Sequence, residues 1–373
     1  MDPVTHVATG LIISQLVPTP SRLGAAVAGV IFAVLPDLDY FLVAVDRLAF
    51  IRHHRGFTHS LIAIPLFALL GAGLGRALTG PRWFRPLFFL GLAVLASHLL
   101  LDLATSFGTQ IFSPFSRRKV TLDWLFIIDP YLTLLLVAGA AAALWSPLWG
   151  RKAGAFFLAA AGGYLFICGL YHQQALTLAQ QVFPETHLAG KPQNPRQTEI
   201  RLLNWQSFPQ TPESIIVAAL PQPFSCRRWQ LIAAGPQGIS QTFVELPYPA
   251  GLMKAVRVNQ AGAAAIPVHQ DCRVPAVPYQ PPQDLQVHTW TRALPAPVEL
   301  SQEAAQVLNT YLEFARFPLL YRAQVLGEEH LWEWLDLRFS VPGRAFPFVL
   351  QFYLDRGGRL RQWLIGRCQG EGR

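Results

Sequence analysis

Long apolar runs without charged residues alternate with short polar connections in the first 176 residues. The runs at 130–150 and 153–176 match the length of about 20 residues that a membrane-spanning helix needs. The runs at 58–78 and 84–105 reach this length once their interfacial residues are included. The pattern therefore predicts four membrane-spanning helices in this half of the chain.

Two shorter apolar segments, 5–17 and 23–35, precede these runs. The polar stretch 18–22 predicts a turn between them, and Pro36 ends the second segment because proline cannot continue a helix. Each segment is too short to cross a bilayer comfortably, so we predict a helical hairpin buried against the other helices. Residues 1–184 are thus expected to form an all-α polytopic membrane domain.

The pattern changes beyond residue 184. Residues 185–198 are rich in Pro, Gln and Asn, which indicates a linker. In 199–373, short apolar runs separated by Pro and Gly predict strands, and an amphipathic segment with Ser301 as N-cap predicts a helix at 301–317. The predicted strands lie at 212–220, 227–234, 241–247, 254–258, 286–292, 331–340, 346–355 and 359–365. We expect a soluble α+β domain whose strands are mostly antiparallel.

Composition and charge limit the classes of protein to which this chain can belong. Only 14% of the residues are charged, against about 25% in ordinary soluble domains, and this argues against disordered, coiled-coil or collagen-like chains. The net charge is +8. Because the cations of the first half lie between apolar runs, membrane lipids are expected as partners and nucleic acid is not. The four cysteines show no CxxC spacing, so we expect neither a disulfide framework nor a thiolate zinc site.

Following the predicted helices back and forth assigns each polar connection to one of two membrane faces. One face, where segment 5–17 begins, carries six basic residues: Arg47, Arg52, Arg55, Arg117, Arg118 and Lys119. The other face also carries six: Arg22, Arg76, Arg82, Arg85, Arg151 and Lys152. The positive-inside rule therefore gives no orientation from the sequence.

Histidine and aspartate gather on the first of these faces. His98 and Asp102 stand at i and i+4 on one helical face, although a buried hydrogen bond would explain that pair equally well. Asp37 and Asp39 follow the helix-ending Pro36, and one of them could be an N-cap. The stretch 53–60 (His-His-Arg-Gly-Phe-Thr-His-Ser) precedes an apolar helix, with Thr58 as its expected N-cap; an interfacial basic loop is the alternative.

Taken together, these residues predict a metal site near one membrane face. The candidate ligands are His6, Asp37, Asp39, His54, His59, His98 and Asp102. Mixed imidazole and carboxylate donors suit Zn²⁺, with Mn²⁺ or Fe²⁺ as alternatives. Seven candidates exceed the approximately three protein ligands of an open catalytic zinc site, so more than one ion is expected.

The order of these motifs resembles the bacterial inner-membrane family of metal-dependent hydrolases, which is related to the zinc-dependent phospholipase C group. The resemblance covers about residues 1–176 and is weaker in the soluble part. The matching motifs are Thr5-His6, Pro36-Asp37-Leu38-Asp39, His54-Arg55-Gly56-Phe57-Thr58-His59-Ser60 and His98-Leu99-Leu100-Leu101-Asp102. The resemblance implies a multi-pass protein of the bacterial inner membrane with metal-dependent hydrolase activity.

Two interpretations follow. In the first, the protein is an enzyme that cleaves a phosphoester in a lipid or lipid-linked substrate with a metal-activated water. Asp39 or Asp102 would act as general base, and Arg55 would contact substrate phosphate rather than a structural acid. In the second, the helices form a non-catalytic, metal-stabilised membrane anchor or a metal transporter that presents the soluble domain. A transporter needs polar groups along a path to both faces, whereas the ionisable residues here gather at one face, which favours the hydrolase.

Overall fold

The computed structural model describes residues 1–146, 148–184, 216–235, 238–248, 258–259, 272–274, 276–291 and 299–366. The chain divides into two compact units. The helical unit comprises Met1–Val45 and His53–Gly169. The sheet unit comprises Asp46–Arg52 and the described residues from Leu170 onward.

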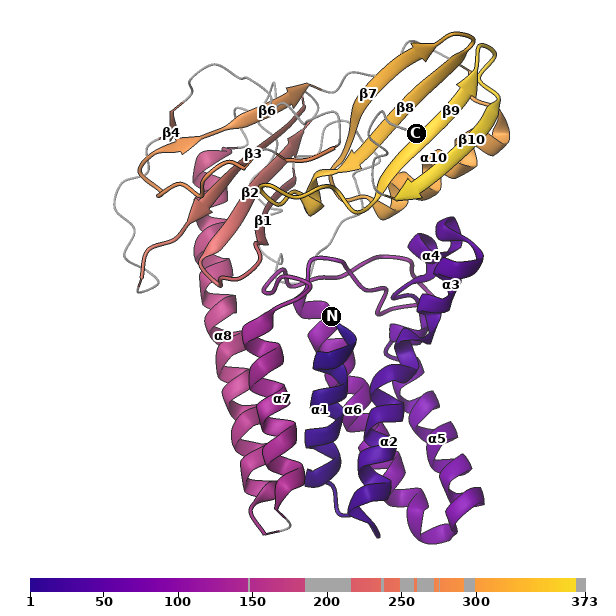
Figure 1. Cartoon of the computed structure of the whole chain (residues 1–373), viewed down its shortest axis with the longest axis vertical. Helices are drawn as coiled ribbons and strands as arrows, with labels where there is room; N and C mark the ends of the chain where they lie inside the picture. The colour runs from indigo at the N-terminus through magenta and orange to yellow at the C-terminus, as the bar shows by residue number, and fades with distance from the viewer. Residues whose placement is uncertain are drawn as a thin grey trace. The chain divides into compact units, whose positions relative to one another are not determined.

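The helical unit is a bundle of apolar helices, in which a long connection, 105–129, joins α6 to α7 (Figure 1). Helix α1 packs against α2, α6 and α7, and α5 packs against α6. Side chains of Asp2, Ser21 and Asp129 cap the first turns of α1, α2 and α7. The elements are α1 (Pro3–Leu16), α2 (Arg22–Val34), η1 (Leu35–Phe41), α3 (Leu42–Val45), η2 (Phe57–His59), α5 (Ala63–Thr79), η3 (Pro81–Trp83), α6 (Phe84–Ala104), α7 (Pro130–Trp145) and the first part of α8 (Gly150–Val182).

Among the residues that the structure describes, three helical stretches are long and apolar enough to cross a membrane: Arg22–Val45, Pro81–Ala104 and Gly150–Val182. The first corrects our expectation that 23–35 is too short, because η1 and α3 continue the helix beyond Pro36. By contrast, α7 ends at Trp145 and is only 16 residues long, so a full span over 130–150 is not supported. The predicted span at 58–78 is the second arm of a pair, Arg47–His59 and Ala63–Thr79, that is bent by 70°.

Two glycines allow α1 and α2 to approach closely. A Cβ atom on Gly10 would lie 2.5 Å from the carbonyl oxygen of Gly29, and one on Gly29 would lie 2.6 Å from the carbonyl oxygen of Gly10. Only hydrogen fits at both positions, as at other close contacts between apolar helices. This crossing holds the start of α1, with His6, and the end of α2 in one bundle.

The sheet unit contains two four-stranded antiparallel sheets, in the orders β1-β2-β3-β6 and β10-β9-β8-β7. A core cluster that includes Ile232, Phe317 and Leu335 joins the two sheets. The strands are β1 (Ile216–Pro221), β2 (Arg228–Gly235), β3 (Gly238–Glu245), β6 (His288–Thr291), β7 (Pro318–Leu326), β8 (Glu329–Asp336), β9 (Val349–Asp355) and β10 (Leu360–Gly366), with a short parallel pair of β4 (Val258–Asn259) and β5 (Leu285–Gln286).

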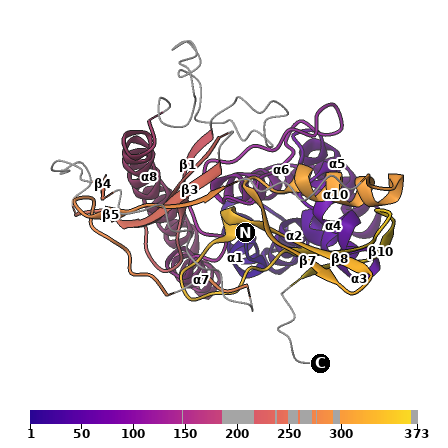
Figure 2. The same cartoon turned by 90° about the horizontal axis from the view of Figure 1, so that it is seen from above.

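Helices cover the outer faces of these sheets. The end of α8 lies along β1, β2 and β3, as Figures 1 and 2 both show, and Tyr171, Leu178 and Trp229 share one core. Helix α10 (Gln302–Phe314) packs on the other sheet, where the Tyr311 hydroxyl donates to the Phe348 carbonyl over 2.8 Å. The compact sheet unit therefore begins inside α8, before the linker predicted at 185–198, which lies outside the described residues.

The sheet unit confirms the expected α+β class with antiparallel sheets, and Ser301 caps α10 as predicted by accepting a hydrogen bond from the Ala304 N–H. Strand β7 was not predicted. The expectation of no disulfide framework did not foresee a single bond: Cys272 is disulfide-bonded, whereas Cys168 and Cys226 are free. Sequence spacing could not indicate this bond because it depends on which distant segments the fold brings together.

Candidate metal centre

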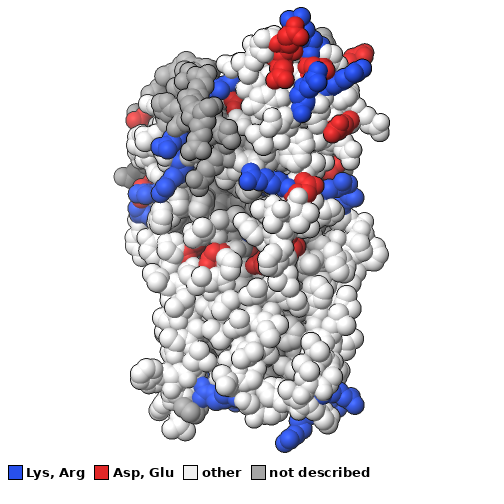
Figure 3. Space-filling view, turned by 45° about the vertical axis from the view of Figure 1, so that its right-hand side comes forward, with Lys and Arg blue, Asp and Glu red and all other residues white. Residues whose placement is uncertain are grey.

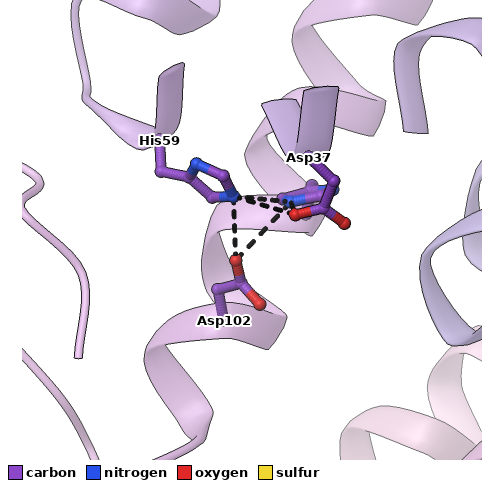
Figure 4. Close-up of side chains that lie close together, drawn as sticks. Asp37, His59 and Asp102 are labelled. Atoms are coloured by element: carbon purple, nitrogen blue, oxygen red, sulfur yellow. Dashed lines mark hydrogen bonds and ion pairs between the residues drawn. The ribbon is translucent and has the colours of Figure 1, made fainter. Parts of the chain in front are cut away.

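Four of the predicted ligands meet in one cluster inside the helical unit, and Figure 4 labels three of them, Asp37, His59 and Asp102. The Nε2 atom of His59 lies 3.2 Å from Nε2 of His98 and 3.2 Å from Oδ2 of Asp102. The Oδ1 atom of Asp37 lies 3.3 Å from Nε2 of His59 and 3.7 Å from Nε2 of His98. We call Asp37, His59, His98 and Asp102 the four-donor cluster. Across the described residues it is the one group of three or more such side chains whose donor atoms all lie within 4.8 Å.

Breaks in the helices place these donors. Pro36 interrupts α2, and the following 3₁₀ turn carries Asp37. A second 3₁₀ turn, Phe57–His59, precedes α5 and carries His59. His98 and Asp102 lie one turn apart near the end of α6, so both side chains emerge on one face of that helix. The cluster thus forms where three helical segments begin or end.

The spacing of the donors fits a tetrahedral metal ion. Bond lengths of about 2.0–2.2 Å at tetrahedral angles place neighbouring donor atoms roughly 3.3–3.6 Å apart. Five donor separations in the cluster range from 3.2 to 3.7 Å. Two carboxylates and two imidazoles also form the mixed donor set that Zn²⁺, Mn²⁺ and Fe²⁺ accept.

Hydrogen bonds at the other ring nitrogens orient both imidazoles. Nδ1 of His98 lies 2.8 Å from the Ala33 carbonyl oxygen, to which it can only donate. Nδ1 of His59 lies 2.9 Å from the Thr58 hydroxyl, which in turn donates to Asp39 over 2.9 Å. With Nδ1 protonated in each ring, both Nε2 atoms present lone pairs. Two lone pairs facing each other at 3.2 Å repel, and either a metal cation between them or a proton on one Nε2 atom relieves that repulsion.

Asp39 and His54 lie beside the four-donor cluster rather than in it. One oxygen of Asp39 is 2.8 Å from Nδ1 of His54. The other accepts hydrogen bonds from the Arg55 backbone N–H and the Thr58 hydroxyl. Asp39 therefore links His54 to the hydroxyl that orients His59. Such an outer carboxylate fixes the direction of a ligand imidazole and raises its basicity.

Arg55 departs from our expectation. We predicted that it contacts substrate phosphate rather than a structural acid, but its guanidinium lies 2.9 Å from Oδ1 of Asp102 and donates to the Thr105 hydroxyl over 2.8 Å. Its side chain is also stacked on Phe107, with the guanidinium carbon 4.9 Å from the ring centroid. Only 3% of Arg55 is exposed, and its backbone φ is 58°. A buried carboxylate needs this partner to remain charged.

His6 lies against the cluster. Its ring stacks on that of His98 with centroids 3.7 Å apart, and its Nε2 is 3.3 Å from Oδ1 of Asp102. The Met1 amino nitrogen contacts the same oxygen. Both nitrogens of His6 and Oδ2 of Asp102 are buried without a hydrogen-bond partner among the described residues. Buried polar atoms of this kind are rare unless a ligand satisfies them.

Sequence reasoning missed the groups that orient the ligands. Thr58 was expected to cap α5, but α5 begins at Ala63 and the Thr58 hydroxyl bridges Asp39 and His59 instead. Its position directly before His59 was the available signal. The Ala33 carbonyl and the Thr105 hydroxyl had no sequence signal, because both act across the fold on residues distant in the chain.

Comparison with known proteins identifies the family. The YdjM inner membrane protein family matches residues 1–175. The inner membrane protein YbcI of Escherichia coli (strain K12) is 36% identical over 137 residues, which cover 32% of this chain and 72% of YbcI. The chain belongs to the YdjM inner membrane protein family.

A second relative is also similar to part of the chain. The uncharacterized protein YfhP of Bacillus subtilis (strain 168) is 30% identical over 179 residues, which cover 46% of this chain and 53% of YfhP. The chain thus spans about half the length of YfhP. No solved structure matches. These matches place the helical unit in an inner-membrane family and carry no description of hydrolase or phospholipase activity.

Proposed function

We propose that the helical unit is a metal-dependent hydrolase of the bacterial inner membrane that cleaves a phosphoester in a lipid or lipid-linked substrate. The observation that carries the proposal is the pair of imidazole Nε2 atoms that lie 3.2 Å apart between two carboxylates, at separations that suit a tetrahedral metal ion. The candidate membrane helices would cross the bilayer as a multi-pass bundle. The cluster lies at the end of α6, so that, if this helix spans the bilayer, lipid phosphates would come close to it.

The four-donor cluster would hold a divalent cation, for which Zn²⁺ is the first choice and Mn²⁺ or Fe²⁺ are alternatives. A cation there would supply Lewis-acid polarisation of a phosphoryl oxygen and would acidify water. The side chain of Asp37 is 17% exposed, whereas those of His59, His98 and Asp102 are 0–2% exposed. Asp37 is thus the donor on the accessible side, where a substrate would enter.

The residues around the four-donor cluster would position Asp102 and accept a proton. Arg55 and Thr105 hold Asp102 so that its Oδ2 faces the two imidazoles. The Asp39–His54 pair is the proposed proton acceptor, because Asp102 is fully buried and already paired. Arg55 stabilises negative charge indirectly, through Asp102, rather than by touching phosphate.

One observation favours a second function. Structural zinc sites usually have four protein ligands, whereas open catalytic sites keep about three and a free position. The presence of four donors therefore supports a metal-stabilised membrane anchor. A hydrolase would require the substrate to replace Asp37 as a metal ligand or to add a fifth ligand. Replacing the cation with Co²⁺ distinguishes these functions, because the visible absorption of Co²⁺ changes when a fifth ligand enters. A hydrolase would show this change on addition of a phosphoester, and an anchor would not.

The direct test is metal content and hydrolysis by the purified full chain. His98→Ala should remove most of the bound metal, measured by mass spectrometry, and abolish phosphate release from detergent-dispersed phospholipids. His53→Ala is the matched control, because His53 is exposed and lies outside the cluster. Metal retained in full by His98→Ala would contradict the site. Metal bound normally without hydrolysis of any lipid phosphoester would favour the anchor.

A further inference from the structure

The end of the helical unit remote from the four-donor cluster carries cations without acids. Its three connections, 18–22, 76–85 and 146–152, contain six basic residues and no Asp or Glu. The charged side chains in view at this end are all basic (Figure 3). We call it the cation-only end, and its basic residues are Arg22, Arg76, Arg82, Arg85, Arg151 and Lys152.

Most of these cations are available to an external partner. Arg76, Arg82, Arg85 and Arg151 make no ion pair with another described residue, and Arg82, Arg85 and Arg151 are exposed. Arg85 also lines an open, otherwise apolar groove of about 620 Å³ between the end of α1 and the start of α6. An apolar groove with a cation at its rim matches the acyl chain and phosphate of an anionic lipid.

The opposite end of the unit has a different balance. All acids of the helical unit lie there: Asp2, Asp37, Asp39, Asp102, Asp123 and Asp129. Two of its cations are also withdrawn from the surface. Arg55 is 3% exposed and paired with Asp102, and Lys119 is 5% exposed above the Phe107 ring. The equal counts of basic residues on the two faces thus conceal a difference in the number of cations that lipid headgroups would meet, because two of the six on this face are buried.

A second observation comes from the sheet unit and does not depend on how the two units are arranged. Cys272 is disulfide-bonded, and structural disulfides persist in oxidising compartments outside the cytoplasm. The sheet unit follows α8, a candidate membrane helix whose first residue, Gly150, belongs to the cation-only end. If α8 crosses the bilayer, the cation-only end and the sheet unit are on opposite sides.

We infer that the cation-only end binds the anionic headgroups of the cytoplasmic leaflet, so that the four-donor cluster opens on the extracytoplasmic side. The cytoplasmic leaflet carries the negative surface potential that attracts Lys and Arg, and positive connections are retained in the cytoplasm. If the hydrolase proposed above is correct, its substrate is a phosphoester presented at the outer leaflet of the inner membrane. The orientation itself is independent of any activity.

Cysteine labelling tests the orientation. In a Cys168→Ala, Cys226→Ser background, Thr79→Cys marks the cation-only end and Ser116→Cys marks the end with the cluster. A membrane-impermeant maleimide should label Ser116→Cys in spheroplasts and Thr79→Cys only in inverted membrane vesicles. The reverse pattern would overturn the inference. Both variants should be labelled in detergent, which shows that each cysteine is reactive in the folded chain.

The same background tests the disulfide. Without an added cysteine it should be labelled only after reduction, and labelling of Cys272 in the unreduced protein would remove the second observation. Neither measurement uses hydrolysis, so failure of the orientation and failure of the proposed function are distinguishable.

Binding of anionic lipid tests the surface. Phosphatidylglycerol retained by the full chain in neutral detergent should bind roughly thirtyfold more weakly in Arg82→Gln, Arg85→Gln, as expected for two lost headgroup contacts. Arg117→Gln, Arg118→Gln is the matched control, because it removes two exposed cations from the other end and should change retention little. Equal losses in the two double variants would contradict a specific role for the cation-only end.

Discussion

Both units bury an aspartate against an arginine, but the two pairs differ in what surrounds them. In the sheet unit, Asp336 lies 2.8 Å from the Arg338 guanidinium, and both side chains are fully buried. The backbone N–H groups of Arg316, Phe317 and Arg338 donate to its two oxygens. Every oxygen of Asp336 therefore has partners from the chain itself.

The pair in the helical unit is incomplete by comparison. Arg55, His6 and the Met1 amino group all approach Oδ1 of Asp102. Oδ2 has no hydrogen-bond partner among the described residues and faces His59 and His98 instead. A fully satisfied buried network stabilises a fold, whereas a buried carboxylate oxygen that faces two imidazole nitrogens is available to a metal cation or a shared proton. The same two residue types thus serve structure in one unit and a candidate site in the other.

The largest expected effect is the loss of the satisfied pair. Asp336→Ala leaves Arg338 buried without a counterion, and breaking such a pair costs about 3–5 kcal/mol in the free energy of unfolding. Thermal unfolding followed by tryptophan fluorescence should show early melting of the sheet unit. Metal content of the helical unit should remain unchanged. A loss of metal in this variant would contradict the conclusion that only the Asp102–Arg55 pair belongs to the metal site. Asp284→Asn, in a loop of the sheet unit, serves as control.

A smaller effect is expected when Arg55 and Arg338 are each replaced by lysine, and the two variants should differ in which property they lose. Arg55→Lys keeps the charge but loses the planar arrangement that reaches both Asp102 and Thr105. We expect metal affinity to fall about 10–100-fold, as for other residues that orient ligands, with little change in unfolding temperature. Arg338→Lys should show the reverse, since Arg338 lies between the Phe314 and Phe339 rings. Titration with a chromophoric chelator measures the first quantity and calorimetry the second.

The smallest effect concerns Asp355, a partly exposed carboxylate whose oxygen accepts backbone hydrogen bonds. Hydrogen bonds from the backbone N–H groups of Arg359 and Gly357 lower the pKa of Asp355 below its ordinary value of 3.8. The ionised form therefore favours the folded state above this pH, and the contribution is lost as the pH falls through the lowered pKa. Asp355→Asn should slightly flatten the acid dependence of unfolding. An unchanged acid dependence would show that solvent screens these bonds completely.

The apolar pattern predicted most helices because it depends on neighbours three and four residues apart. The stretch 84–105 is confirmed as α6, a candidate membrane helix. The pattern failed where tertiary packing takes over. Residues 22–45 continue through Pro36 as a longer stretch, and β7 has no clear alternation because it is an edge strand with an exposed second half.

For the candidate site, the sequence alone determined which residue types were available and at what spacing. His98 and Asp102 share a helical face by local geometry, and the motif around His59 stands out by composition. Only the tertiary structure decided which candidates meet. Asp37 lies in the cluster, Asp39 contacts His54, and Arg55 forms an ion pair with Asp102. These choices depend on contacts between segments up to 65 residues apart. Local periodicity cannot predict such contacts, because they form only when the helices pack against one another.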